Sequence, residues 1–116
     1  MTKLNIYHNP RCSKSRQTLR LLREQGLTPN IIYYLKTPPA AAELRKILNA
    51  LALSARELLR TNEILYSELN LDDKALTEEQ LIRVMVEHPI LIQRPIVTRG
   101  EKAVLGRPPE NIREIL

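Results

Sequence analysis

The chain has 116 residues, 43% of them apolar, which fits one domain with a modest hydrophobic core. Trp and Phe are absent and only four Tyr supply aromatic rings, which argues against a protein that stacks nucleic-acid bases. The net charge of +5 attracts anions of any kind, but no block of five or more like charges forms a basic tail. We therefore expect no nucleic-acid partner.

The cysteine content is a single residue, Cys12, so the chain cannot form an internal disulfide. This excludes the secreted disulfide-rich scaffolds and favours a reducing compartment. The N-terminal residues contain no apolar stretch long enough for a signal peptide, and no run approaches the roughly 18 to 20 residues of a membrane span. We expect a cytoplasmic protein with no membrane association.

The first third of the chain predicts a strand, a helix and a second strand. Residues 3–7 have the pattern of a short strand. A helix is expected over 13–25, where Leu19 and Leu22 share one stripe. Residues 30–35 are rich in Ile and Tyr and indicate another strand. This order predicts a βαβ unit with parallel strands and a right-handed crossover.

The middle of the chain is predicted to be helical. Thr37, followed by two prolines, has the pattern of an N-cap with Pro at the first helical position and predicts a helix over about 40–51. Two capping-box signatures, at 54–57 and 77–80, each precede an apolar-periodic segment.

The last third changes character. Residues 95–98 and 102–105 flank a turn and predict a hairpin, and Pro108 or Pro109 begins a final helix. The full order indicates an α/β fold of the thioredoxin-like (glutaredoxin-like) type. We expect one domain over 1–116, with a βαβ…ββα core and a helical insertion at about 40–88.

Cys12 stands between the predicted end of a strand and the start of a helix. Free backbone N–H groups and the positive end of the helix dipole stabilise a thiolate there and can also bind an oxyanion. We take His8, Ser15 and Arg16 as the candidate residues that activate the Cys12 thiolate, since positive charge near the sulfur favours ionisation. The alternative is that Cys12 is a small, partly buried apolar residue.

Ser15 occupies the last position of a Cys-x-x-Ser pattern, where dithiol oxidoreductases carry a second cysteine. The chain therefore cannot resolve its own disulfide. If Cys12 turns over by redox chemistry, the second thiol must come from another molecule, for which glutathione with glutaredoxin is the natural supplier.

Five separated segments, in order and spacing, resemble the glutaredoxin-coupled arsenate reductase family: His8–Leu19, Ile31–Pro39, Glu57–Asn62, His88–Val97 and Gly106–Pro109. The resemblance implies a thioredoxin-like oxidoreductase of arsenic detoxification that reduces arsenate through the redox-active Cys12. It also implies glutathione as co-substrate, glutaredoxin as partner and no bound cofactor. Three arginines, Arg60, Arg94 and Arg107, match the family's oxyanion-binding positions, and Pro95 is implied to be a cis proline.

Other interpretations of these residues stay open. Each arginine taken singly could be a solvated surface residue, and His8 could merely end a strand. His88 is expected to be structural, because two distant histidines and one cysteine have no metal-ligand spacing, so we expect no metal. Without a Gly-x-Gly-x-x-Gly run, no nicotinamide site is expected either.

Two other functions compete with arsenate reduction. One is a glutathione-dependent thiol oxidoreductase of the same family with another substrate. The more basic loop around Cys12 (Arg11, Ser13, Lys14) is compatible with either function, since it could bind arsenate more strongly or mark such a relative. The other is a redox-sensing regulator that binds RNA polymerase. Such regulators often carry Cys-x-x-Cys, a pattern that Ser15 breaks here.

Overall fold

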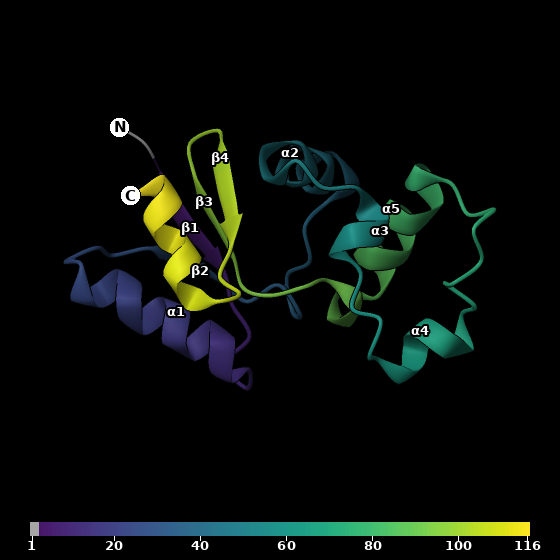
Figure 1. Cartoon of the computed structure of the whole chain (residues 1–116), viewed down its shortest axis with the longest axis horizontal. Coiled ribbons are helices and arrows are strands. Elements are labelled where there is room, and N and C mark those ends of the chain that lie inside the picture. The colour runs from purple at the N-terminus through teal and green to yellow at the C-terminus, as the bar shows by residue number, and fades with distance from the viewer. Residues whose placement is uncertain (1–2) are drawn as a thin grey trace. The chain divides into compact units, whose positions relative to one another are not determined.

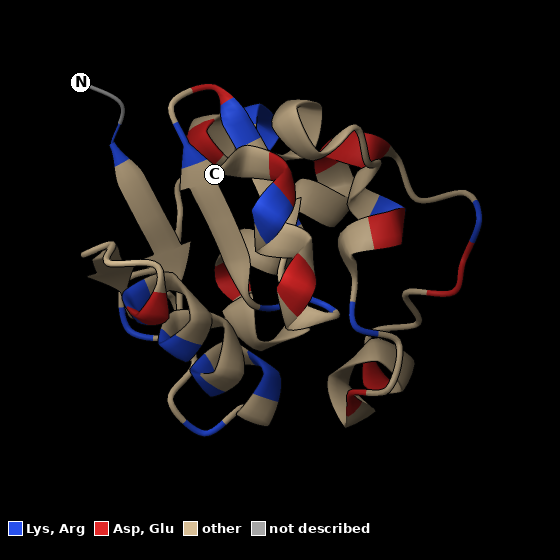
Figure 2. Ribbon diagram, turned by 60° about the vertical axis from the view of Figure 1, so that its left-hand side comes forward, with Lys and Arg blue, Asp and Glu red and all other residues tan. Residues whose placement is uncertain are grey.

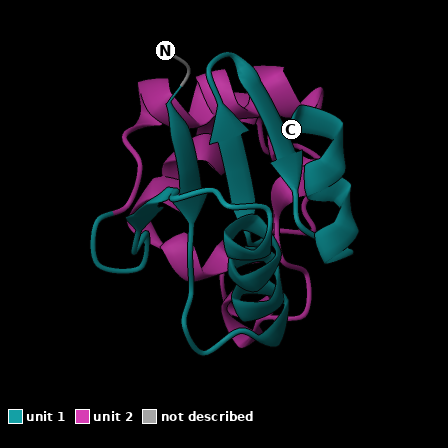
Figure 3. Ribbon diagram, turned by 90° about the vertical axis from the view of Figure 1, so that its left-hand side faces the viewer, with its two compact units in different colours: residues 1–37, 94–116 teal, residues 38–93 magenta. Residues whose placement is uncertain are grey.

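The structure, a computed structural model, describes residues 3–116 and divides into two compact units (Figures 1 and 3). The first unit joins the residues up to Thr37 to residues 94–116, and the second comprises residues 38–93. The second unit contains the helical insertion that was expected at about 40–88. The prediction of a single domain over 1–116 stays a prediction.

The first unit is built on a four-stranded sheet with the order β2-β1-β3-β4. Its strands are β1 (Leu4–Tyr7), β2 (Asn30–Ile32), β3 (Ile96–Arg99) and β4 (Lys102–Leu105). β1 and β2 are parallel and are joined by helix α1 (Ser13–Glu24), which confirms the βαβ unit. β3 is antiparallel to both β1 and β4, which confirms the hairpin.

One face of this sheet carries the core of the first unit. The register aligns Ile31, Ile6, Val97 and Val104 in a row across the four strands, and such a row points to one face. The buried side chains that pack against this row come from α1 and from the C-terminal 3₁₀ helix η2 (Pro109–Ile115); they are Leu19, Leu22, Ile112 and Ile115. The same stripe of leucines that predicted α1 is therefore its buried face.

Two local predictions from the sequence were wrong. Strand β2 ends at Ile32 and not at residue 35, because the Tyr33 carbonyl accepts hydrogen bonds from the N–H groups of Lys36 (3.0 Å) and Thr37 (2.9 Å) and closes a turn. Since Thr37 belongs to that turn, it does not cap the next helix, whose N-cap is Ala40. The final helix begins at Pro109, as predicted, and is a 3₁₀ helix.

The second unit is helical, as predicted. It contains α2 (Ala41–Leu51), α3 (Ala55–Leu58), α4 (Ile64–Glu68), α5 (Glu78–Glu87) and the 3₁₀ turn η1 (Pro89–Leu91). Both capping boxes are present: the Ser54 hydroxyl accepts from the Glu57 N–H and the Thr77 hydroxyl from the Gln80 N–H, each at 3.2 Å.

Helix α5 organises the second unit by packing against α2, α3 and η1. The contacts bury apolar side chains from each element, including Leu44, Leu58, Leu81, Met85 and Leu91. Of the helices described within residues 3–116, none is both long and apolar enough to cross a membrane.

Candidate functional site

The loop that follows β1 is fixed by hydrogen bonds from within itself and from α1. The N–H of Cys12 donates to the Asn9 carbonyl oxygen (3.0 Å), and the N–H of Arg11 donates to the Asn9 side-chain oxygen (3.0 Å). The Arg16 guanidinium reaches back to donate to the Pro10 carbonyl oxygen (2.9 Å). The loop therefore presents Cys12 in one defined position at the start of α1.

Cys12 is the N-cap residue of α1, with extended backbone angles (φ −95°, ψ 124°). In this position a side chain faces the free N–H groups of the first helical turn. Burial raises the pKa of the Cys12 thiol, but hydrogen bonding from the Ser15 backbone, the Arg94 side chain and the Lys14 backbone lowers it, as does the Arg94 charge. The net effect is a pKa below that of an ordinary cysteine thiol, and His8 and Arg16, which the sequence suggested as activating residues, are not among its causes.

Arg94 comes from the segment that precedes β3 and is the side chain that acts on the Cys12 sulfur. The register pairs Tyr7 with Ile96, so the residues just before β3 reach the same sheet edge as the loop after β1. The Arg94–Pro95 peptide is cis, which confirms what the resemblance implied. Within residues 3–116 the Nε and Nη1 atoms of Arg94 are buried and have no hydrogen-bond partner.

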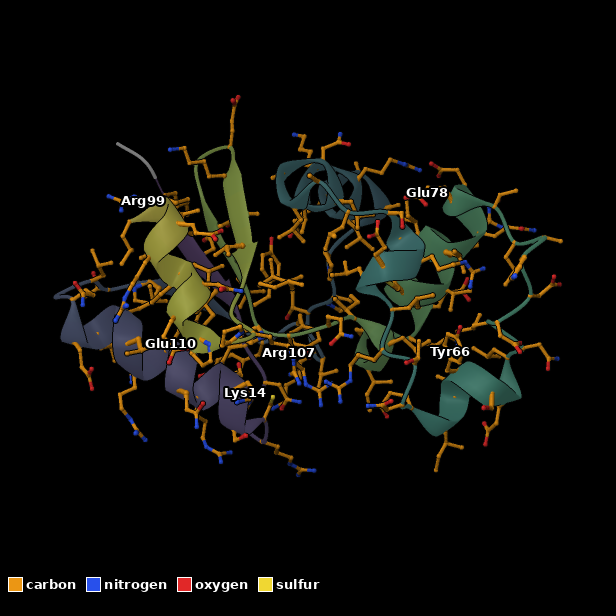
Figure 4. The ribbon with its side chains drawn as sticks, viewed as in Figure 1. Lys14, Tyr66, Glu78, Arg99, Arg107 and Glu110 are labelled. Carbon is orange, nitrogen blue, oxygen red and sulfur yellow. The ribbon has the colours of Figure 1, made fainter. Side chains whose placement is uncertain are left out.

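Arg107 lies on the segment after β4 (Figure 4) and is tied to Arg94. Its Nη1 donates to the Arg94 carbonyl oxygen (3.1 Å). The preceding residue, Gly106, donates its N–H to the Pro95 carbonyl oxygen (2.9 Å). Arg94 and Arg107, two of the three predicted oxyanion-binding arginines, are thus linked by hydrogen bonds between the segment before β3 and the segment after β4.

Thr18 joins these segments to α1, which sequence reasoning missed. Its buried hydroxyl bonds the carbonyl oxygens of Lys14 (2.8 Å) and Gly106 (3.3 Å). A Cβ added at Gly106 would collide with the Thr18 hydroxyl and would lie 2.8 Å from Cγ of Pro95. The absence of a side chain at position 106 therefore lets this backbone segment lie against Thr18 and Pro95. In the sequence, the glycine directly before Arg107 was the only sign of this contact.

His8 and Ser15 form a buried pair beside the loop. The His8 Nδ1 atom lies 2.6 Å from the Ser15 hydroxyl oxygen, which also accepts a hydrogen bond from the Asn9 N–H (3.1 Å). The His8 ring meets the Tyr33 ring edge to face, with centroids 6.0 Å apart. Burial lowers the pKa of His8, and the charges of Arg23 and Arg16 lower it further, so the imidazole is neutral at pH 7.

The predicted site residues therefore occupy different places. Cys12, Arg94 and Arg107 belong to the first unit, as do His8, Ser15 and Arg16. Ser15 contributes through its backbone N–H to the thiol and through its hydroxyl to His8. Arg60 lies in the second unit, where its N–H donates to the Leu91 carbonyl oxygen (2.7 Å) and its Nε pairs with Glu63 (3.2 Å).

A metal site in a protein needs several His, Cys, Asp or Glu side chains close together. Across residues 3–116, no three His, Cys, Asp or Glu side chains gather in a way that could hold a metal ion. His88 ends α5 and begins η1, and its N–H donates to the Val84 carbonyl oxygen (2.8 Å).

A mixed four-stranded sheet, with a cysteine of lowered pKa at the N-cap position of its first helix and a cis-proline segment before β3, defines the thioredoxin-like class. The family model of the ArsC family matches residues 7–115. The arsenate reductase of Neisseria meningitidis serogroup A is 48% identical over 117 residues and is covered in full, as is this chain. The uncharacterized protein YfgD of Escherichia coli K12 is 57% identical, with 100% of this chain and 99% of YfgD covered.

A solved structure extends this similarity to three dimensions. The arsenate reductase from Vibrio cholerae superposes with a TM-score of 0.96 at 49% identity, covering 99% of this chain and 98% of that one. The chain belongs to the ArsC family.

Proposed function

We propose that this protein is a cytoplasmic arsenate reductase of arsenic detoxification, with the Cys12 thiolate as nucleophile and glutathione with glutaredoxin as reductant. One observation carries the proposal: Arg94 lowers the pKa of the Cys12 thiol, and its buried Nε and Nη1 have no hydrogen-bond partner within residues 3–116. Buried guanidinium N–H groups are costly to leave unpaired, and a tetrahedral oxyanion would satisfy them. Relatives named arsenate reductase support the choice of substrate.

Binding of the oxyanion would use charge and geometry together. A guanidinium group offers several N–H donors in one plane, which suits an anion that carries one to two negative charges on several oxygens. Arg94 would contact arsenate directly, Arg107 would add a second positive charge, and the free N–H groups at the start of α1 would add backbone donors. Arg60, the third arginine that the resemblance implies, lies in the second unit, and its role in oxyanion binding stays a prediction.

The chemistry then follows in three steps. The Cys12 thiolate attacks arsenic(V), and one arsenate oxygen leaves as water after protonation, which forms an S–As bond. Glutathione thiolate attacks the Cys12 sulfur, and the S–As electron pair stays on arsenic, which leaves as arsenite. A further thiol, delivered by glutaredoxin, attacks the resulting Cys12–glutathione disulfide and restores the Cys12 thiolate. The sum is one arsenate reduced to arsenite and water while two thiols become a disulfide.

The test is arsenite production by the purified protein with glutathione and glutaredoxin, beside a Cys12→Ser variant. We expect turnover in the wild type alone. Turnover no higher than that of Cys12→Ser would overturn arsenate reduction. If the same wild-type protein reduces small glutathione mixed disulfides without producing arsenite, it is a thiol oxidoreductase with another substrate.

A further inference from the structure

The exposed face of α1 carries a line of basic side chains that starts at the reactive cysteine. We call Arg16, Arg20 and Arg23 the α1 basic stripe; all three are exposed (Figure 2 shows Lys and Arg positions in blue). At 3.6 residues per turn, Cys12, Arg16 and Arg23 point within about 40° of one another, and Arg20 lies within about 80° of Cys12. The stripe therefore runs from the N-terminal end of the helix almost to its C-terminal end on one side.

A surface groove follows the stripe. Its volume is about 460 Å³, and its lining residues are Arg16, Leu19, Arg20, Arg23 and Glu24. In the part of the chain that the structure describes, no carboxylate lies within ion-pair distance of the three arginines. Like charges three and four residues apart destabilise a helix, and only Arg23, in the last turn, gains from the helix dipole. Glu24, four residues after Arg20, offsets one of these three charges, so this side of α1 keeps a net charge of +2.

The positive charge of the α1 basic stripe also acts on the candidate site. After burial, the charges of Arg23 and Arg16 are the causes that lower the pKa of His8, which stands directly before the cysteine loop. A positive potential therefore extends from the groove to the neighbourhood of Cys12. Such a field attracts and orients a negatively charged partner before contact.

The length of the α1 basic stripe sets a lower limit on the size of that partner. Along the helix axis Arg16 lies about 6 Å from Cys12 and Arg23 about 16 Å, at about 1.5 Å per residue. An extended tripeptide spans only about 10 Å, so glutathione with its central thiol at Cys12 would reach Arg16 and not Arg23. A partner that uses the whole stripe while its thiol attacks at Cys12 must be larger than glutathione.

We propose that the α1 basic stripe is the docking surface for a protein thiol reductant that carries carboxylates beside its reactive cysteine. The inference rests on the proposed function only in that Cys12 forms a mixed disulfide with glutathione. The docked partner's thiolate attacks the glutathione sulfur, the S–S bond breaks, and the Cys12 thiolate leaves. The partner keeps the glutathione as a new mixed disulfide.

The experiment uses no oxyanion, so its outcome is independent of arsenate reduction. Oxidised glutathione converts the single cysteine into one defined Cys12–glutathione disulfide, and mass spectrometry follows its reduction by a purified glutaredoxin with an acidic active-site face. The rate is measured at about 10 mM and about 1 M salt, where the screening length falls from about 30 to 3 Å. The test variant is Arg20→Gln/Arg23→Gln. The control is Lys46→Gln/Lys74→Gln, which changes the net charge equally at exposed sites of the second unit.

We expect the stripe variant to be reduced about tenfold more slowly than wild type at low salt and at the wild-type rate at high salt. The control variant should match the wild type throughout, and reduction by uncharged dithiothreitol should be the same for all three proteins. Equal rates with glutaredoxin at low salt would overturn the proposal. A loss that is equally large with dithiothreitol would also overturn it, because Cys12 itself would have changed. If glutathione alone slows as much as glutaredoxin, the groove is a tripeptide site and not a protein-docking surface.

Discussion

Arg94 is the residue at which thiol activation and anion binding meet. Its side chain favours the Cys12 thiolate by hydrogen bonding and charge, and it keeps two buried nitrogen atoms without partners within residues 3–116. A single guanidinium can do both because its donors point in different directions in one plane. A bound anion would interact with the same guanidinium that stabilises the Cys12 thiolate. Substrate binding and the reactivity of the sulfur would therefore be coupled through this one side chain.

Replacing Arg94 by Gln should therefore slow thiol alkylation. Gln keeps an N–H donor on a shorter side chain and loses the charge, so the pKa of Cys12 rises and less thiolate is present at pH 7. We expect iodoacetamide to react several-fold more slowly at pH 7, with the difference vanishing at pH values where both thiols are ionised. Arg113→Gln, an exposed change in the same unit, is the matched control and should leave the rate unaltered. An unchanged profile for Arg94→Gln would contradict this role.

His8 should make the folded state sensitive to mild acid. Its pKa is lowered in the folded protein, chiefly by burial, whereas the unfolded chain titrates near 6.5. The stability that depends on a neutral His8 is therefore present above about pH 6.5 and is lost as pH falls below it, by no more than about 1.4 kcal/mol per pH unit. Asn can mimic Nδ1 towards Ser15 without titrating. The urea midpoint, followed by circular dichroism, should drop more for wild type than for His8→Asn between about pH 7.5 and 5.5. Parallel losses would show that His8 is not the titrating group.

At the scale of elements, the site depends on how α1 meets the two segments that flank the β3–β4 hairpin. Thr18 bonds the Gly106 carbonyl oxygen, Gly106 bonds the Pro95 carbonyl oxygen, and Arg107 bonds the Arg94 carbonyl oxygen. These contacts connect the helix that carries Cys12 to the segments that carry two arginines. The arginines are thus placed by packing of elements and not by their own local sequence.

Gly106→Ala tests that packing. The added methyl group would collide with Thr18 and crowd Pro95, and overpacking of this kind costs about 1–3 kcal/mol. Thr18→Ala alone should cost about 1 kcal/mol through its lost hydrogen bonds. Because Thr18→Ala also removes the atom that collides, the double variant should be more stable than the sum of the two single costs implies. Additive unfolding free energies in urea would show that these residues do not touch.

At the scale of the whole molecule, the chain passes out of the first unit after Thr37 and returns at Arg94. In the chain, the second unit is therefore an insertion between the two parts of the first unit. Each unit holds about half of the 116 residues, a size at which a domain is only marginally stable by itself. If the second unit unfolded alone, it would become a long flexible loop, and closing that loop would cost the first unit conformational entropy.

We consequently expect one cooperative unfolding transition, as the prediction of a single domain requires. Hydrogen exchange in increasing urea reports on each unit separately, through core amides such as Ile6 and Val97 in the first and Leu44 and Met85 in the second. Their opening free energies should converge on one value. Two separate plateaus would establish two independently folding domains instead.

Much of the fold was predictable because it is encoded locally. The two capping boxes, the leucine stripe of α1 and the β3–β4 hairpin each depend on residues a few positions apart, and each was predicted. The local errors have a common origin. The turn at Tyr33 removed Thr37 from its expected role as a helix cap, and no side-chain periodicity signals such a turn.

The sequence by itself determined that Cys12 begins a helix, that no second cysteine follows it at position 15, and hence that any redox turnover needs an external thiol. The start of a helix depends on neighbouring residues, and the absence of a second cysteine is visible in the sequence itself. Only the tertiary structure decided which arginine reaches the sulfur and that His8 is buried and neutral. Arg94 is 82 positions from Cys12, and their meeting depends on the antiparallel pairing of Tyr7 with Ile96. Contacts between residues so far apart in the chain are set by strand register and by the packing of elements, which no local pattern specifies.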